Sequence, residues 1–249
     1  MEQRTFETSL GQIVLRGRDT GRPILLVLPG LYSNTLFGSG IQASWLGLDV
    51  MIGRVPGDGA PQLASISIGA FASAYCEAVC ALGDRSVFAY GISAGALTAL
   101  ALRGPNIKGQ LLIEPPLQTG GLWPLRDALR DVGPEGWEAI SWPVFGISAT
   151  CHEDRDYAHL LDSLVAPTTV LVGDVLLEPR RPLEDQPSLV GEAARNRLQK
   201  TSRLSLHIIP NCGHSIVGGN PAAVHLHLKR SIASALGEEF ARPASRIGS

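Results

Sequence analysis

The chain has 249 residues, of which 45% are hydrophobic and 18% are charged. This composition supplies enough apolar material for a substantial core and excludes disorder over most of the chain, which requires low hydrophobicity and a high net charge. The 21 basic and 23 acidic residues leave a formal net charge of −2. Because the charge balance points to neither nucleic acid nor an anionic membrane, we expect neither among its partners.

The N-terminus and the cysteines bear on the cellular compartment. No apolar segment typical of a secretory signal peptide is present at the start, and the first apolar run, residues 24–28, is too short to span a bilayer. The four cysteines are irregularly spaced, which favours free thiols over a disulfide framework or a zinc site; they are Cys76, Cys80, Cys151 and Cys212. We therefore expect a cytoplasmic protein without a metal or another cofactor.

Short apolar runs alternate with helical patterns along the chain. The run at 24–28 is continuous, as in a strand that is buried on both faces of a sheet. The other predicted strands cover residues 5–8, 13–16, 48–55, 86–90, 109–113, 168–172 and 204–209, and helices are predicted over 66–82, 94–103, 188–200 and 222–236. This alternation predicts a single α/β domain over residues 1–249, with a mostly parallel central sheet and helices on both faces.

Residues 117–165 interrupt the alternation between two predicted strands. Several prolines fall here, together with a group of large apolar side chains: Leu122, Trp123, Leu125, Trp137, Trp142 and Phe145. We expect this segment to be an insertion that forms a small lid over one end of the sheet. Ordinary packing onto the sheet would account equally well for each individual tryptophan.

The most specific motif is G-I-S-A-G at residues 91–95, between a predicted strand and a predicted helix. The pattern G-x-S-x-G is weak alone, but in this context it indicates a nucleophile elbow, a sharp turn that holds the serine clear of the sheet. Glycines on either side let the strand and the helix approach closely, and the helix N-terminus favours an oxyanion. We interpret Ser93 as a nucleophile rather than as part of a plain Gly-Ser turn.

In this context the chain resembles the α/β-hydrolase superfamily over about residues 13–236. Four segments that follow predicted strands carry the resemblance: L-P-G-L at 28–31, V-P-G-D-G at 55–59, the elbow, and N-C-G-H at 211–214. The family's catalytic triad runs in the order Ser, acid, His, and Ser93 precedes His214 here. The resemblance implies the α/β-hydrolase fold and a serine esterase or thioesterase that forms an acyl-enzyme on Ser93.

His214 is the histidine that we expect to act as the general base. It lies in a glycine-flanked loop between the last predicted strand and the last predicted helix, where an imidazole can reach a serine and reorient. The other five histidines lie in that strand, in the last helix or in the inserted segment: His152, His159, His207, His225 and His227.

The acid that orients the histidine is not at its usual place. The family commonly carries it after the strand that is predicted here at 168–172, often as Gly-x-x-Asp. The third residue after Gly173 is Leu176, which is not acidic. This departure leaves several carboxylates as alternatives for holding the imidazole in the correct tautomer.

Three carboxylates are alternatives for this role. Asp174 could hold the histidine if the turn after Gly173 is tighter than usual, and it is the acid that we expect first. Glu178 could do so if that turn is wider, and we expect it last. Glu114 is the second, because it follows the strand predicted at 109–113, where thioesterase domains of synthetases carry the triad acid.

The oxyanion hole requires two backbone N–H groups. The resemblance places one at Ala94, after the nucleophile, and the other at Leu31, with Tyr32 as the alternative. Many family members have His-Gly before this point, whereas Pro29-Gly30 resembles thioesterase-like members.

Side chains near these groups are expected to hold the substrate. We expect Tyr32, Trp123 and Trp142 to contact the apolar acyl or aromatic part of a small-molecule ester or thioester. Two other hypotheses remain. The same scaffold supports C–C or amide hydrolysis and acyl transfer, and a non-catalytic binding protein would account for the missing acid at Leu176.

Overall fold

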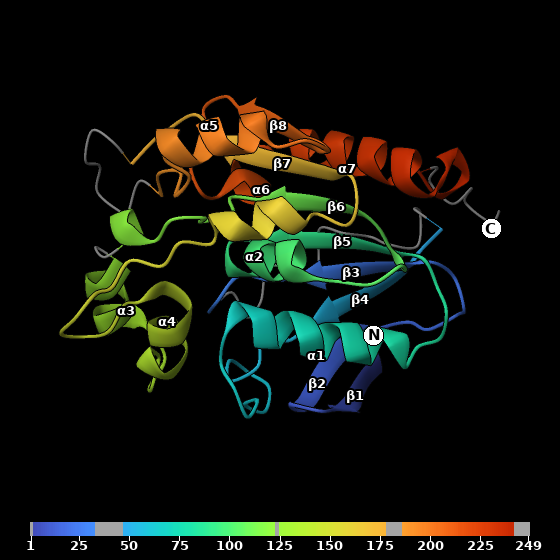
Figure 1. The fold of residues 1–249 in the computed structure, drawn as a ribbon, viewed down its shortest axis with the longest axis horizontal. Coiled ribbons are helices and arrows are strands. Elements are labelled where there is room, and N and C mark those ends of the chain that lie inside the picture. Colours follow the sequence, from blue (N-terminus) through green and yellow to red (C-terminus); the bar gives the residue numbers. More distant parts are fainter. Residues whose placement is uncertain (1, 33–46, 123–124, 178–185, 242–249) are drawn as a thin grey trace, which may run out of the picture.

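A sheet of eight strands forms the centre of the protein. The computed structural model describes residues 2–32, 47–122, 125–177 and 186–241 (Figure 1). The strands are β1 (Glu2–Thr8), β2 (Gly11–Gly17), β3 (Ile24–Leu28), β4 (Asp49–Gly53), β5 (Val87–Ile92), β6 (Ile107–Ile113), β7 (Thr168–Gly173) and β8 (Leu204–Ile209). Their order in the sheet is β1-β2-β4-β3-β5-β6-β7-β8. The pairs β1–β2 and β2–β4 are antiparallel and all other pairs are parallel, which confirms the mostly parallel sheet.

The helices cover both faces of the sheet, as the alternation of elements predicted (Figure 1). One apolar core lies between the sheet and the helices α1 (Ile68–Cys80), α2 (Ala94–Ala101) and α5 (Glu192–Lys200). The other core lies beneath α6 (Ile216–Gly219) and α7 (Pro221–Leu236). Strand β3 shows why both faces need cover: Leu26 enters the first core, and Leu25 and Val27 enter the second.

Side-chain caps mark the starts of two helices, and a third helix starts later than predicted. The Ser67 side chain accepts a hydrogen bond from Ala70 N–H at the start of α1, and Asn220 does the same for Ala223 at the start of α7. Helix α5 begins at Glu192 rather than at residue 188 as predicted. The reason is tertiary, because the residues before the helix bind a buried carboxylate that is described below.

The insertion between β6 and β7 contains η2 (Gly120–Leu122), α3 (Leu125–Val132), α4 (Glu138–Phe145) and η3 (Ala158–Ser163). Helices α3 and α4 lie beyond one end of the sheet (Figure 1), whereas η3 packs against α2 and α5. Within the described ranges, no helix combines the length and the apolar character needed to cross a membrane.

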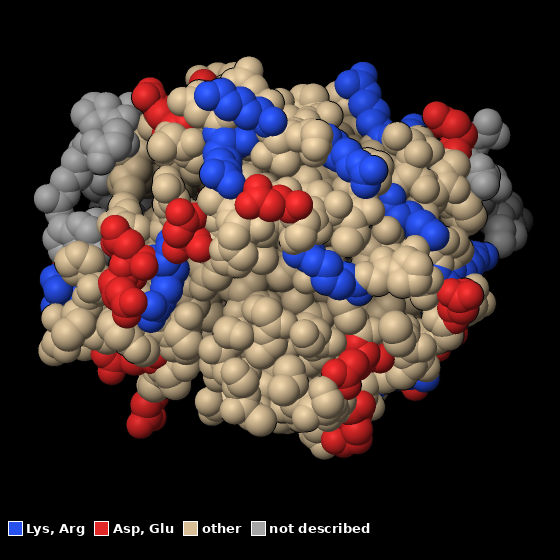
Figure 2. Space-filling model, in the orientation of Figure 1, with Lys and Arg blue, Asp and Glu red and all other residues tan. Residues whose placement is uncertain are grey.

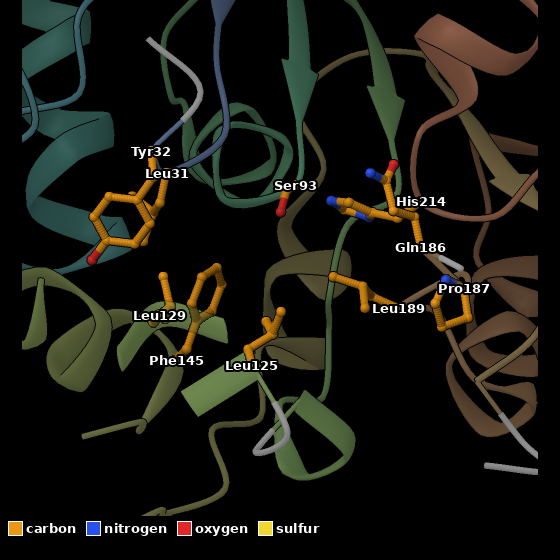
Figure 3. Close-up of a pocket in the computed structure, with 10 residues that line it drawn as sticks. All are labelled: Leu31, Tyr32, Ser93, Leu125, Leu129, Phe145, Gln186, Pro187, Leu189 and His214. Atoms are coloured by element: carbon orange, nitrogen blue, oxygen red, sulfur yellow. The ribbon is translucent and has the colours of Figure 1, made fainter. Parts of the chain in front are cut away.

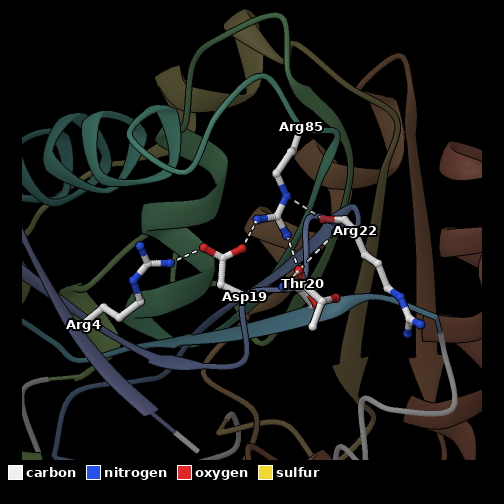
Figure 4. A network of polar contacts seen from close by, with 6 residues as sticks. Arg4, Asp19, Thr20, Arg22 and Arg85 are labelled. Atoms are coloured by element: carbon white, nitrogen blue, oxygen red, sulfur yellow. Dashed lines mark hydrogen bonds and ion pairs between the residues drawn. The ribbon is translucent and has the colours of Figure 1, made fainter.

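A partly buried charge network lies at the amino-terminal ends of β4 and β5 (Figure 4). The Asp49 carboxylate, 3% exposed, accepts hydrogen bonds from Thr20 and from Arg22 N–H, and it pairs with the Arg85 guanidinium. Arg85 also pairs with Asp19 at 2.7 Å, and Asp19 in turn pairs with Arg4. The network therefore joins the start of the sheet to the preceding loop.

On the face shown in Figure 2, lysine and arginine are interspersed with aspartate and glutamate.

Candidate active site

Ser93 occupies the sharp turn between β5 and α2. Its backbone has φ 53° and ψ −120°, a conformation that a residue with a side chain rarely adopts. A Cβ atom on Gly91 would lie 2.4 Å from the Gly95 carbonyl oxygen, and one on Gly95 would lie 2.0 Å from the Leu28 carbonyl oxygen. Both positions therefore require glycine, and the turn has the geometry of a nucleophile elbow.

His214 lies in the loop after β8 and faces the serine. Figure 3 shows the Ser93 hydroxyl and the His214 imidazole directed toward each other at the edge of a pocket that both line. The backbone N–H of His214 donates a hydrogen bond of 2.6 Å to the Gln186 carbonyl, which fixes the loop. The structure thus brings together the two residues that the sequence indicated as nucleophile and base.

Glu114 is the carboxylate that lies beside His214. It follows β6 directly, has a positive φ of 51° and is fully buried. Its Oε2 lies 3.6 Å from His214 Nδ1, a few tenths of an ångström beyond hydrogen-bond distance. Among the residues that the structure describes, no other carboxylate pairs with this histidine.

Asp174 is exposed, and its carboxylate accepts a 3.2 Å hydrogen bond from Cys212 N–H. The carboxylate beside His214 is therefore that of Glu114, which the sequence ranked second, and not that of Asp174, which it ranked first. The cause is the close approach of two loops: Gly173 packs against the carbonyl oxygen of Cys212, which a Cβ would meet at 2.1 Å. Glu178 lies outside the described residues.

The candidate oxyanion hole lies between two loops. Ala94 is the first residue of α2, where its N–H has no partner within the helix. The Tyr32 N–H donates a 2.6 Å hydrogen bond to Asp58 Oδ2, so it is already occupied. Leu31, which lines the pocket, therefore fits the second donor better than Tyr32 does.

The Tyr32 side chain joins this loop to the insertion. Its hydroxyl donates to the Trp137 carbonyl at 2.6 Å and lies 3.1 Å from Ser141 Oγ. Burial raises the pKa of Tyr32, so the hydroxyl keeps the proton that it donates. The Asp58 carboxylate on one side and α4 on the other thus hold the turn after β3.

The pocket is apolar and has a volume of about 270 Å³. Apart from Ser93 and His214, its lining is Leu31, Tyr32, Leu125, Leu129, Phe145, Gln186, Pro187 and Leu189 (Figure 3). No carboxylate, ammonium or guanidinium group belongs to this described lining. Such a pocket suits an uncharged apolar group placed next to the serine.

The two tryptophans expected in the pocket are not part of its described lining. Trp142 is 37% exposed, and its ring lies 5.5 Å from the Arg155 guanidinium carbon. Trp123 lies outside the described residues. The insertion contributes instead through α3 and α4, with Leu125 and Phe145 among the apolar residues noted in the sequence.

Several site residues carry no motif. Ser188 and Arg195 contact or approach Glu114, and Leu129 and Leu189 line the pocket. Nothing in their sequence context signals these roles, because each depends on how separate segments pack. Within the described ranges, no group of three or more potential metal ligands occurs.

The sequence matches the model of the alpha/beta hydrolase family over residues 25–225. The chain belongs to this family. The match confirms the family that the elbow and the order of Ser93 and His214 indicated. A comparison with curated proteins found no match for this alpha/beta hydrolase.

Solved structures with the same fold include three esterases or lactonases. The carboxylesterase CesB of Bacillus subtilis is 13% identical with a TM-score of 0.67, covering 95% of this chain and 93% of its own. A thermophilic esterase from Thermogutta terrifontis is 17% identical (TM-score 0.62; 94% and 99% covered). The N-acyl homoserine lactonase AidH is 18% identical (TM-score 0.62; 94% and 97% covered). At these identities the likeness shows the fold alone.

Proposed function

We propose that this protein is a serine hydrolase that cleaves a carboxylic ester or thioester through an acyl-enzyme on Ser93. The observation that carries the proposal is the placement of Ser93 at a strained elbow, opposite His214, which lies 3.6 Å from the buried Glu114. Nucleophile, base and orienting acid come from three separate loops at one edge of the sheet. That is the arrangement that acyl transfer requires.

Each group has a definite role in the reaction. Ser93 Oγ attacks the carbonyl carbon while His214 Nε2 takes the hydroxyl proton, and the N–H groups of Leu31 and Ala94 stabilise the oxyanion. His214 then gives that proton to the departing alcohol or thiol, and the acyl-enzyme remains. Water, deprotonated by His214, attacks the acyl carbon and releases the acid and free Ser93. Glu114 holds the imidazole and stabilises its cation.

The pocket supports an apolar acyl or aromatic group as the part of the substrate nearest Ser93. Its lining carries only apolar or uncharged side chains besides the catalytic groups, and helices α3 and α4 act as the lid. The position of Glu114 after β6 and the Pro29-Gly30 turn both favour a thioester within this class. A cytoplasmic location and the absence of a cofactor stay predictions from the sequence.

A fluorophosphonate probe tests the proposal, because it reacts with activated serines. We expect one covalent adduct per chain in the wild type and none in Ser93→Ala. Ser65→Ala is the matched control, since Ser65 is exposed and precedes α1. An unlabelled wild type would favour a binding protein, whereas an adduct with no turnover of p-nitrophenyl esters and acyl-thioesters of graded length would favour another chemistry.

A further inference from the structure

A guanidinium group contacts the candidate triad indirectly, on the side of Glu114. Arg195, on α5, donates from Nη2 to Ser188 Oγ at 2.8 Å and to the Gly173 carbonyl at 2.5 Å, and from Nε to the Val190 carbonyl at 2.7 Å. Burial lowers the pKa of Arg195 and the charge of Glu114 opposes that effect, but arginine keeps its proton in proteins. A fixed positive charge therefore lies one hydroxyl away from Glu114.

Ser188 connects this charge to the acid. It is 1% exposed, and its Oγ lies 2.8 Å from Glu114 Oε1 and 3.0 Å from Oε2. Arg195 Nη2 and Val190 N–H can only donate, so the Ser188 oxygen accepts from both. The single hydroxyl proton is then left for Glu114. This geometry fixes the direction of the hydrogen bond and requires Glu114 to be the acceptor.

Glu114 receives two further hydrogen bonds that keep it in place. Gly173 N–H donates to Oε1 at 2.7 Å, and Leu189 N–H donates to Oε2 at 2.8 Å. The Ser188 hydroxyl and these two N–H groups thus hold both carboxylate oxygens in place. The same Oε2 faces His214, so the donors also fix its distance from the imidazole.

The segment that carries Ser188 also touches the base and the pocket. The Gln186 carbonyl accepts the His214 N–H, while the side chains of Gln186, Pro187 and Leu189 line the pocket. Residues 186–190 therefore join the acid, the base and the substrate-facing wall in one short stretch. Removing the Ser188 hydroxyl would release the acid, while the backbone bonds from Leu189 N–H to Glu114 and from His214 N–H to the Gln186 carbonyl would still hold the wall.

We propose that Ser188 and Arg195 are positioning residues of the hydrolase: they keep Glu114 directed at His214, and the charge of Arg195 sets the lower pH limit of activity. This inference rests on the proposed function. Neither residue touches the pocket in the described structure, so both act through Glu114. A cation beside an acid–base pair opposes proton uptake by either member, whichever takes the proton.

Other charged or titratable groups face this cluster and stay in every variant. Asp174, after β7, and Glu192, on α5, both act on Arg195 by charge. Cys212, in the histidine loop, lies near Asp174 and Glu114, and burial raises the pKa of its thiol. Because these groups are common to all variants below, a change in the pH profile reports the substituted residue.

The test compares charge removal at two arginines of α5. Arg195→Gln removes the inner guanidinium, whereas Arg197→Gln removes one that is 51% exposed and pairs with Asp162 at the surface. In Arg195→Gln we expect the acidic limb of the kcat/KM profile to move up by about 0.5–1 pH unit. In Arg197→Gln the acidic limb of the kcat/KM profile should stay where it is in the wild type. Arg195→Lys keeps a cation and should restore most of the wild-type limb.

Ser188→Ala tests the hydroxyl that connects Arg195 to Glu114. We expect kcat to fall about tenfold with KM changed less than about twofold, because only the reacting groups are disturbed. In Ser188→Ala with Arg195→Gln the loss should not exceed that of the worse single variant, as expected for residues that act in series. Thermal unfolding of each variant shows whether it is folded. If Ser188→Ala does not fold, the comparison of Arg195→Gln with Arg195→Lys still decides the test.

The outcomes separate this inference from the proposed function. If wild-type Ser93 takes no fluorophosphonate, the hydrolase proposal fails. If Ser93 reacts and turns over ester but Arg195→Gln keeps the wild-type acidic limb, only the positioning role fails. An equal shift in Arg197→Gln, or additive losses in the double variant, would likewise overturn the positioning role.

Discussion

Glu114 Oε2 lies 3.6 Å from His214 Nδ1, and the two residues follow strands that are separated in the sheet by β7. Under the proposed function, this pairing makes Glu114 rather than Asp174 the orienting acid. Glu114→Gln keeps the shape of the side chain but loses its charge, so the imidazole loses the partner that stabilises its cation. We expect kcat to fall by about 10⁴.

The matched control for this prediction is Asp174→Asn. The Asp174 carboxylate is exposed and binds Cys212 N–H, which an asparagine oxygen also accepts. We expect kcat within about threefold of the wild type. Steady-state kinetics on a p-nitrophenyl ester distinguish the two variants, and a large loss in Asp174→Asn with little loss in Glu114→Gln would exchange their roles.

The elbow should not tolerate a methyl group on the helix side. In Gly95→Ala the new Cβ would lie 2.0 Å from the Leu28 carbonyl oxygen, so β3 and α2 must separate. We expect a loss of about 3 kcal/mol or more in the free energy of unfolding, together with loss of fluorophosphonate labelling. Urea unfolding gives the first quantity.

The control for the elbow is Gly69→Ala, on the exposed side of α1, where the nearest atom to a new Cβ is 3.9 Å away. Alanine is the better helix former, so stability should rise by about 0.5–1 kcal/mol. Equal behaviour of the two alanine variants would contradict the steric account of the elbow.

The pocket volume of about 270 Å³ should limit the length of the acyl group. Leu129→Trp fills part of this space from α3, so the preferred p-nitrophenyl ester should become shorter, with the change mainly in kcat/KM. Trp142→Ala serves as the control, because Trp142 is outside the described lining and should leave the preference unchanged. A shifted preference in the control alone would place the acyl group elsewhere.

The charge network at the amino-terminal ends of the strands should matter for stability and not for catalysis (Figure 4). Arg85→Met leaves the Asp49 carboxylate buried without its cation, so we expect a loss of about 3 kcal/mol in the free energy of unfolding. Arg4→Gln removes a partly exposed pair and should cost less than about 1 kcal/mol. Unchanged kcat in both folded variants is part of the prediction.

The sequence predicted those features that depend on residues close together in the chain. The elbow could be recognised because its strand, turn and helix are consecutive, and β3 because its apolar run is continuous. The sequence could not tell which carboxylate lies beside His214, because that distance depends on how the loops after β6, β7 and β8 pack. The start of α5 was predicted too early for the same reason, since Ser188 and Leu189 bind Glu114 instead of joining the helix.

Ser188, Arg195 and the leucines of the pocket show the limit of motif reasoning. No short pattern marks a serine that bridges a guanidinium and a carboxylate across three segments. Trp142 shows the same limit for residue type: this large aromatic residue of the insertion was expected at the substrate, and in the structure it is partly exposed and lies beside the Arg155 guanidinium. Residue type indicated the chemistry, and packing decided the place.

The most direct test of the account is the mass of the enzyme during turnover of an activated ester. Rapid acid quenching followed by peptide mass analysis should find the acyl group on the peptide that carries Ser93, and Ser93→Ala should show neither the acyl group nor the burst of released alcohol. Turnover that continues unchanged in Ser93→Ala, or an acyl group found on another residue, would contradict the central claim.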